Sequence, residues 1–499
     1  MNRNTWLGGS LALVNLLLYG YLISHLNWSG PIVFAVSALF LVTSSFYLTW
    51  NLGYAYAIHR RSNHPNGQVL DSSSIALSSV AIVVPAYREG LGVMESMLKA
   101  FLQLDYPAEK LRLYLCDDTE DAGERMAAKR LCEKLGGGRI EYSAREHRRG
   151  FKAGAINDIL PRITGEYCIM LDVDHVPQPD MVRRLVSAKI GSKADFLMFP
   201  QYFSNQDENS IASASSLKQL VDYRIERVGR CTTNSGFCVT TNWITRVETL
   251  KRLGGLDEST VTEDLATGLI AHSKGFRIDI LDDKLAQGLA PNSLDAWRKQ
   301  QYRWSSGTFD VARNIFPRVW KRLSWHQRLD YSLCISWYLS GFFSFVLYLF
   351  PIFTALGLRF FRYGSATQFL TFTLSLITIS WVLTNLPAYL ESKSLRKTIL
   401  AYASSLGVSD VYVRAIISTF KGKRRSFSVT KKGKPGHLSM GTALRVLKFH
   451  MFFLAIGVTA ALYSLTLERS LDAIANVGWL WYNNFWIILS ALVLGKKWS

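Results

Sequence analysis

The fold is decided by the stretch EYCIMLDVD, residues 166–174, in which an unbroken apolar run ends in two carboxylates. Such a run fits a strand buried on both faces of a parallel sheet. Two earlier stretches have the same form: VAIVVPAY at 80–87 and LRLYLCDD at 111–118. Strand-like and helical patterns alternate from about 75 to 325, so we expect an α/β domain with a mostly parallel sheet. The polar ends of its strands converge on one crevice, where ligands bind in open α/β sheets.

Apolar segments flank this domain on both sides. A bilayer core of about 30 Å needs roughly 20 apolar residues in a helix. Six segments meet this requirement, and we expect them at about 6–26, 32–57, 331–357, 366–390, 442–466 and 474–495. Basic residues follow the second segment at 59–61 and the last at 496–497, which places the α/β domain and both termini in the cytoplasm of a multi-pass plasma-membrane protein. Arg359 and Arg362 fall on the outer side, against this rule.

The predicted organisation has five parts. Between the fourth and fifth spans, 394–420 is amphipathic and basic at its start, which predicts one helix lying at the cytoplasmic interface. The expected parts are two spans in 1–58, the α/β domain in 59–330, two spans in 331–390, an interfacial helix and loop in 391–440, and two spans in 441–499.

The charge of the chain points to lipids and nucleotides. Lysine and arginine number 57 against 38 acidic residues, a formal net charge of +19. The basic residues cluster beside the apolar segments, where they meet membrane lipids or a nucleotide diphosphate, so we expect no nucleic-acid partner. The six cysteines lack metal-ligand spacing and are expected to be reduced. We expect no cleavable signal peptide.

Two carboxylate pairs close predicted strands. Asp172 and Asp174 can hold a hard divalent cation, Mg²⁺ or Mn²⁺, through oxygen ligands. That cation would bridge the phosphates of a sugar nucleotide and neutralise the leaving diphosphate. Asp117 and Asp118 end another strand and are expected to contact the uridine or to help set the metal. The alternative for either pair is a solvated turn or a helix cap.

Two further segments carry candidate chemistry. Lys152 follows three arginines and can meet a phosphate as a point charge, although a basic surface cluster is the alternative. Thr262, Glu263 and Asp264 precede an apolar helix, where Thr262 could serve only as an N-cap. Asp264 is the candidate general base, because inverting sugar transfer needs one carboxylate to deprotonate the attacking hydroxyl.

The string QQYRW, residues 300–304, suits an acceptor site. Trp304 offers a flat apolar face on which a sugar ring can stack. Arg303 can fork onto diphosphate oxygens, and Gln300, beside Gln301, can bond sugar hydroxyls. An interfacial helix with aromatic and basic anchors is the alternative, and it is compatible with an acceptor site beside the membrane.

In combination these motifs resemble the processive family 2 glycosyltransferases, particularly the bacterial cellulose synthase group. That family carries a D,D,D,Q(Q/R)xRW pattern, which is met here by Asp118, Asp174, Asp264 and residues 300–304. The match covers nearly the whole chain in order. The resemblance implies a GT-A fold and an inverting enzyme that polymerises glucose from UDP-glucose into a β-glucan. It also implies that the growing polysaccharide passes through a channel between the membrane helices.

The resemblance also suggests individual roles. It implies that Tyr87 and Glu89 contact the uracil and that Lys152 contacts UDP. It places Phe237 and Cys238 in a segment that touches the polymer end, but the family's Gly-Ser after the cysteine is absent here. This departure leaves the linkage open between β-1,4, β-1,3 and mixed.

A gating-loop motif follows the amphipathic segment. The family pattern FxVTxK is present at 427–432, where Phe427, Thr430 and Lys432 are expected to close over the bound nucleotide. Flanking glycines and a proline suit a mobile lid. Thr430 offers a hydroxyl donor, and Lys432 offers positive charge to the diphosphate.

Other functions remain open at this stage. The sugar is decided by a few pocket contacts, so a hyaluronan, chitin or poly-N-acetylglucosamine synthase is the runner-up. A transferase that adds one sugar to a lipid carrier, or a channel with an inactive domain, fits the acceptor string and the carboxylates less well. No cyclic-di-GMP-binding domain is expected, and accessory or homo-oligomeric partners are not indicated.

Overall fold

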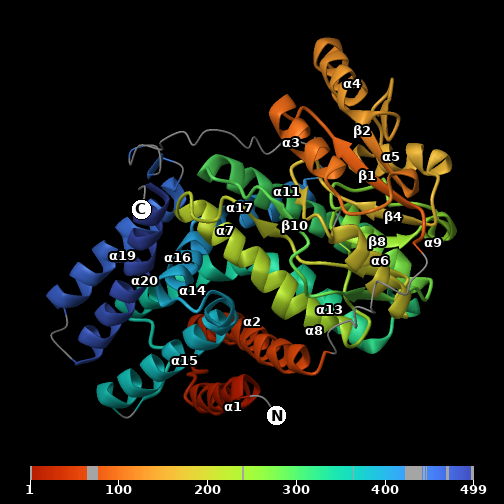
Figure 1. The fold of residues 1–499 in the computed structure, drawn as a ribbon. Coiled ribbons are helices and arrows are strands. Elements are labelled where there is room, and N and C mark those ends of the chain that lie inside the picture. The colour runs from red at the N-terminus through yellow and green to blue at the C-terminus, as the bar shows by residue number, and fades with distance from the viewer. Residues whose placement is uncertain are drawn as a thin grey trace.

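The computed structural model describes residues 3–64, 77–238, 241–363, 365–421, 441, 444–445, 447–467 and 471–495. Figure 1 shows an α/β domain at the upper right and a group of long helices at the lower left, with the N-terminus beneath. Residues 239–240 and 422–440, which include Phe427, Thr430 and Lys432, lie outside the described residues.

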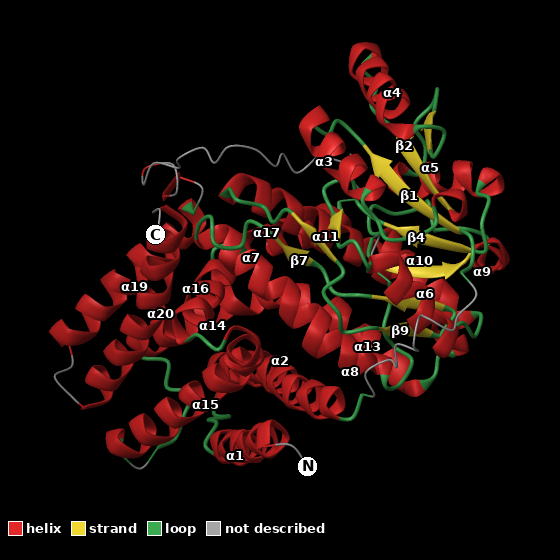
Figure 2. Cartoon of the chain, viewed as in Figure 1, coloured by secondary structure: helices red, strands yellow, loops and turns green. Residues whose placement is uncertain are grey.

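The α/β domain is built on a sheet of seven strands in the order β3-β2-β1-β4-β8-β6-β9, drawn as yellow arrows among helices in Figure 2. Four pairings are parallel: β1 with β2, β1 with β4, β2 with β3, and β6 with β9. Among the described strands of this sheet, β8 alone runs antiparallel to its neighbours, β4 and β6. The predicted mostly parallel sheet is therefore confirmed. The strands are β1 (Val80–Ala86), β2 (Leu111–Asp117), β3 (Ile140–Ala144), β4 (Tyr167–Met170), β6 (Phe196–Met198), β8 (Trp243–Arg246) and β9 (Ile278–Ile280).

A second sheet of three short strands lies beside the first. Its order is β5 (Val176–Pro177), β10 (Ala286–Gly288) and β7 (Tyr202–Phe203). β10 is antiparallel to β5 and parallel to β7. This sheet ties the segment after Asp174 to the segment that leads into the QQYRW helix.

Helices cover both faces of the large sheet, which explains why its central strand β1 is apolar throughout. Every residue of β1 is buried. Ile82 packs in one core cluster with residues of α3 (Leu91–Leu102), α4 (Ala122–Gly136) and α6 (Met181–Gly191). Its neighbour Val83 packs in another with residues of α5 (Phe151–Ile159), α9 (Val247–Leu253) and α10 (Glu263–Ser273). Successive side chains of a strand point to opposite faces, so both faces need apolar residues.

The helices of the α/β domain follow its strands in chain order. The longer ones are α3 (Leu91–Leu102), α4 (Ala122–Gly136), α5 (Phe151–Ile159), α6 (Met181–Gly191), α7 (Ser210–Val221), α9 (Val247–Leu253), α10 (Glu263–Ser273) and α11 (Leu294–Asn314). The short ones are η2 (Ala108–Lys110), η3 (Leu160–Arg162), the π-helical η4 (Asp222–Arg227), α8 (Val228–Cys231), α12 (Phe316–Val319) and η5 (Trp320–Arg322).

All six predicted spans coincide with helices. These are α1 (Arg3–Ser24), α2 (Pro31–Ser62), α13 (Trp325–Ser336) continued by η6 (Trp337–Leu339) and α14 (Ser340–Ala355), α15 (Ala366–Ser392), α19 (Lys448–Leu467) and α20 (Leu471–Gly495). Among the described residues, four stretches are long and apolar enough to cross a membrane: Asn4–Ser24, Pro31–Ser62, Trp325–Ala355 and Thr371–Ser392. The apolar part of α19, Lys448–Tyr463, is shorter.

The single helix predicted for 394–420 is wrong in one respect, because the structure has two helices there. α16 (Leu395–Leu406) and α17 (Ser409–Phe420) are separated at Gly407. α16 packs against α7 and α20, while α17 packs against α11 and α14. Other helices of the protein cover part of the apolar stripe of this segment, since Ala403 packs with Trp486 of α20 and Val411 packs with Trp297 of α11. Leu395, Ile417 and Phe420 are exposed.

Candidate functional site

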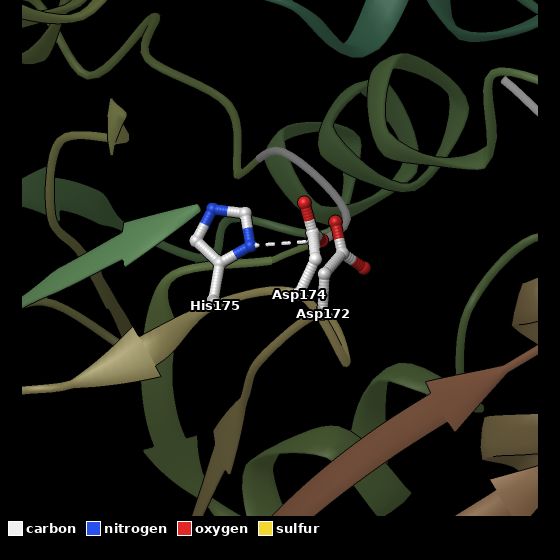
Figure 3. A group of neighbouring side chains, drawn as sticks. All are labelled: Asp172, Asp174 and His175. Carbon is white, nitrogen blue, oxygen red and sulfur yellow. Dashed lines mark hydrogen bonds and ion pairs between the residues drawn. The ribbon is translucent and has the colours of Figure 1, made fainter. Parts of the chain in front are cut away.

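The DVD carboxylates lie in a tight turn directly after β4. The backbone N–H of Asp172 donates to Thr241 Oγ1 at 2.8 Å, and the N–H of His175 donates to the carbonyl of Asp172 at 2.9 Å. Figure 3 shows Asp172, Asp174 and His175 side by side. One potential ligand atom from each lies within 4.8 Å of the others.

His175 is a site residue that the sequence analysis missed, although it directly follows the DVD string. Its Nδ1 lies 3.3 Å from Asp174 Oδ1, and its buried Nε2 has no hydrogen-bond partner among the described residues. Asp174 is 5% exposed and accepts a 3.1 Å hydrogen bond from the N–H of Leu289. Two carboxylates and an imidazole are a donor set that fits a divalent metal ion.

Lys152, at the start of α5, forms an ion pair with Asp172. Burial alone would raise the pKa of Asp172, but the Lys152 ammonium and the His175 ring outweigh it and hold this pKa below its usual value. Asp172 therefore stays ionised at neutral pH. The predicted role of Lys152 at a phosphate is compatible with this position, because a diphosphate bound to the metal would lie beside its ammonium.

The structure separates Asp117 from Asp118. The Asp118 carboxylate faces a cavity and is bound at both oxygens by Arg145, with distances of 2.7 and 2.6 Å. Asp117 does not line that cavity. It accepts instead from the Tyr142 hydroxyl at 2.8 Å and from the N–H of Thr119 at 2.9 Å. Its predicted contact with the nucleotide has no support in this geometry.

We call the cavity in front of the DVD turn the outer cavity; its volume is about 200 Å³. It gathers most of the predicted site residues, namely Tyr87, Glu89, Asp118, Lys152, Asp172, Asp174, Thr262, Glu263, Asp264, Gln300, Gln301, Arg303 and Trp304. Arg148 also lines it and was not predicted: its guanidinium carbon lies 3.6 Å from the centroid of the Tyr87 ring.

The TED residues enter this cavity from the start of α10. Thr262 is the residue before the helix, but its side chain makes no capping hydrogen bond, so capping alone does not account for it. On α11, a side chain at Gly307 would come within 3.0 Å of Thr262. The small residue lets α11 approach α10 closely. This approach brings Trp304 and Asp264 to the same cavity wall.

Burial shapes the charges at this wall. It raises the pKa of Glu263 to about 8 and raises the pKa of Asp264 above its usual value. Burial also lowers the pKa of Arg303, while attraction to Glu263, Asp172 and Asp264 opposes that effect. Arg303 is thus a half-buried cation whose charge interacts with three carboxyl groups, and Asp264 is a stronger base than an exposed aspartate.

A second cavity, which we call the inner cavity, continues from the first and has a volume of about 290 Å³. The two share a set of lining residues: Lys218, Gln219, Thr262, Asp264, Gln301 and Trp304. Beyond them the inner cavity is lined by aromatic residues of α2 and η6, such as Trp50, Tyr54 and Trp337.

A third cavity of about 210 Å³ lies farther along the long helices. It shares Tyr47, Ser344, Thr384, Tyr402 and Leu406 with the inner cavity. The three cavities therefore form a series from the DVD turn into the helices α1, α2, α14 and α15.

The two residues predicted to touch the polymer end take different positions. Phe237 lines the inner cavity, with the Arg227 guanidinium carbon 4.2 Å from its ring centroid. Cys238 lines neither large cavity. It faces a small apolar void behind α10, together with Asp264.

Comparisons with known proteins show which families and structures this chain is similar to. Residues 78–307 match the family described as Glycosyltransferase like family 2. The chain is 29% identical over 263 residues to the cellulose synthase catalytic subunit [UDP-forming] of Pseudomonas fluorescens, covering 51% of this chain and 34% of that protein. The same named protein of Xanthomonas axonopodis pv. citri is 29% identical over 262 residues, covering 51% and 34%. The chain thus spans about a third of the length of these relatives.

A solved structure supports the fold. The mannosyltransferase of Pyrobaculum calidifontis, in complex with GDP-Man and Mn²⁺, superposes with a TM-score of 0.53 at 17% identity. The superposition covers 79% of this chain and 100% of that one.

Proposed function

We propose that this chain is a membrane-embedded, inverting and processive polysaccharide synthase with a GT-A domain, because residues 78–307 match the family described as Glycosyltransferase like family 2 and the chain superposes on a solved mannosyltransferase. It transfers glucose from UDP-glucose to a growing β-glucan, with β-1,4, β-1,3 or mixed linkage. The observation that carries the proposal is the junction at Asp264, Gln301 and Trp304, which line both the outer and the inner cavity. The relatives named UDP-forming support UDP as the leaving group.

The donor is bound in the outer cavity. Tyr87, Glu89 and Asp118 hold the nucleoside end, and Lys152 and Arg303 face the diphosphate. Asp172, Asp174 and His175 would hold a divalent metal ion, which would supply charge neutralisation for the leaving diphosphate. Arg303 lies near Asp172 and Asp264, so it links the leaving-group side of the site to the base.

The acceptor end of the polymer lies over Trp304 at the junction of the cavities. Asp264 accepts the proton of the attacking hydroxyl, because it reaches both cavities and has a raised pKa. The product of each cycle occupies the inner cavity, where Trp50, Tyr54 and Trp337 offer flat apolar faces to sugar rings. Residues 427–432 act as the lid over the nucleotide.

The series of cavities favours a polymer over a single transfer. A transferase acting once on a lipid carrier needs no enclosed space behind its acceptor, whereas a synthase must hold several sugar units. The third cavity, between α1, α2, α14 and α15, extends the path among helices long enough to cross a membrane. We therefore propose that the polymer leaves through these helices, with the α/β domain in the cytoplasm.

The proposal predicts a product that depends on one donor. The protein is purified in detergent and incubated with Mg²⁺ or Mn²⁺ and radiolabelled UDP-glucose, UDP-N-acetylglucosamine or UDP-glucuronic acid, each in turn, and with the last two together. We expect UDP-glucose to give an ethanol-insoluble product that a linkage-specific β-glucanase degrades. Polymer formed from UDP-N-acetylglucosamine alone would favour a chitin or poly-N-acetylglucosamine synthase. Polymer formed only when UDP-N-acetylglucosamine and UDP-glucuronic acid are supplied together would favour a hyaluronan synthase. Label found only as a lipid-extractable monosaccharide would contradict processive synthesis.

A further inference from the structure

Gln301 occupies the border between the outer and inner cavities and lines both. Its side chain is an amide, which can present either two donor hydrogens or an acceptor oxygen to a sugar. Which end faces the acceptor chain decides which sugar hydroxyls it can bind. The structure holds this amide in one orientation.

The orienting group is Tyr412 of α17. Its hydroxyl donates to Gln301 Oε1 at 2.7 Å, and Tyr412 is 2% exposed. The Gln301 Nε2 group makes no hydrogen bond within the part of the chain that the structure describes, and Gln301 lines both cavities. Its two donor hydrogens are therefore available at the cavity surface.

The orientation of Tyr412 is fixed in turn by Lys218 of α7. The Lys218 ammonium donates to the Tyr412 hydroxyl oxygen at 3.1 Å. An ammonium can only donate, so it takes a lone pair of the phenol and turns the phenol hydrogen away from itself. That hydrogen then points to Gln301 Oε1.

The surroundings of Lys218 favour a cation that donates to Tyr412. It lines both cavities, and its nitrogen lies 5.4 Å from the Trp337 ring centroid and 5.8 Å from that of Tyr412. No carboxylate lies within 4.0 Å of its ammonium among the described residues. The aromatic faces stabilise the Lys218 cation, and the Tyr412 hydroxyl accepts its hydrogen bond.

We propose that Lys218 and Tyr412 form a relay that holds the amide N–H groups of Gln301 toward the acceptor chain. They are positioning residues, and the inference rests on the function proposed above. The relay joins α7, α17 and α11, three helices that are distant in sequence. Without Lys218, the phenol is free to accept from the amide, and Gln301 can turn its oxygen to the sugar.

The first test compares Lys218→Met, Lys218→Arg, Tyr412→Phe and the double variant Lys218→Met/Tyr412→Phe, with Lys299→Met as the matched control. Lys299 lies on α11 and pairs with Asp295, outside both cavities. We expect polymer synthesis to fall roughly tenfold in Lys218→Met and in Tyr412→Phe, with an unchanged KM for the UDP-glucose donor. Lys218→Arg recovers most of the rate, and the control is unchanged.

The double variant separates a relay from two independent contacts. Because both residues act through Gln301, the double variant should be no slower than Tyr412→Phe alone. Multiplied losses, near a hundredfold, would overturn the relay and make Lys218 a direct sugar contact. A loss of affinity for UDP-glucose as large as the loss of rate would also overturn the relay, because the relay acts on the acceptor chain and not on the donor.

A second measurement needs no turnover. The melting temperature of the purified protein is measured for Tyr412→Phe, Gln301→Met and their double variant, once with Lys218 present and once together with Lys218→Met. The coupling is the part of the change in melting temperature that is not the sum of the two single changes. We expect a coupling that shrinks when Lys218 is absent, and an unaltered coupling would refute the relay. A wild type without polymer synthesis would instead count against the proposed function, and this measurement would still decide the relay.

Discussion

Asp264→Asn is expected to reduce polymer synthesis by about a hundredfold to ten-thousandfold while UDP binding persists. Asparagine keeps the size and most contacts of aspartate but cannot accept the proton of the acceptor hydroxyl. Asp264 lines both cavities, whereas Tyr87, Glu89 and Asp118, which are expected to hold the nucleoside end, line only the outer cavity. Turnover is measured by incorporation of radiolabelled glucose, and UDP binding by calorimetry on the same preparation.

The control for this variant is Asp295→Asn, an exposed aspartate in the first turn of α11 whose carboxylate pairs only with Lys299 among the described residues. It should leave both rate and binding unchanged. Glu263→Gln, one residue from Asp264, tests whether the neighbouring carboxyl is the base instead. Turnover like that of the wild type in Asp264→Asn, or a larger loss in Glu263→Gln, would remove Asp264 from its role.

The pH profile of the wild type gives a second readout of the same base. Burial raises the pKa of Asp264, and its base function needs the ionised form. Activity is therefore present above the raised pKa and is lost as the pH falls through it. The acid limb should lie at higher pH than an exposed aspartate, with a pKa near 4, would give.

Asp174→Ala is expected to bring synthesis to background and to abolish the response to added Mg²⁺ or Mn²⁺. A diphosphate placed beside Asp172 and Asp174 without a metal ion would bring like charges together. Asp174 is buried next to His175 and is one of the two carboxylates in the group of possible metal ligands among the described residues. Activity is followed after EDTA treatment and after readdition of each ion.

Asp180→Ala is the matched control for Asp174→Ala. Asp180 precedes α6, is exposed, and makes no capping hydrogen bond with its side chain. It should behave as the wild type, losing activity in EDTA and regaining it with metal. Full activity of the wild type in excess EDTA would refute the metal requirement.

The sequence predicted the strands and the motifs of the site well, because both depend on local patterns. The apolar runs at 80–87, 111–118 and 166–174 became neighbouring strands, and their polar ends met in the outer cavity. The order of strands and helices along the chain and the polar residues at the strand ends are enough for this prediction, since parallel strands place their carboxyl ends at one edge of the sheet.

Side-chain direction was harder to predict. Asp117 and Asp118 are adjacent at a strand end, where successive side chains point to opposite sides, so only one could reach the cavity. His175 was missed because an imidazole after DVD carries no strong pattern of its own. Its position became evident only when the turn after β4 brought it beside Asp174.

Contacts between distant helices could not be predicted at all. The amphipathic stripe of 394–420 indicates that one face is covered, but it does not say whether lipid or protein covers it. The structure shows α17 packed on α11, where the Arg298 guanidinium binds the Asp410 carboxylate at 2.9 and 2.6 Å. The inner cavity depends on such packing, so its course could not be predicted from the sequence.

The most direct test of the account is an electron cryomicroscopy structure of the protein trapped during synthesis with UDP-glucose. We predict sugar density that begins beside Trp304 and Asp264 and continues through the inner cavity, past Trp337, toward Tyr47 and Ser344. UDP should occupy the outer cavity at the same time. A polymer that leaves the junction along the surface of the α/β domain, with the inner cavity empty, would contradict the claim that one continuous path serves both synthesis and passage.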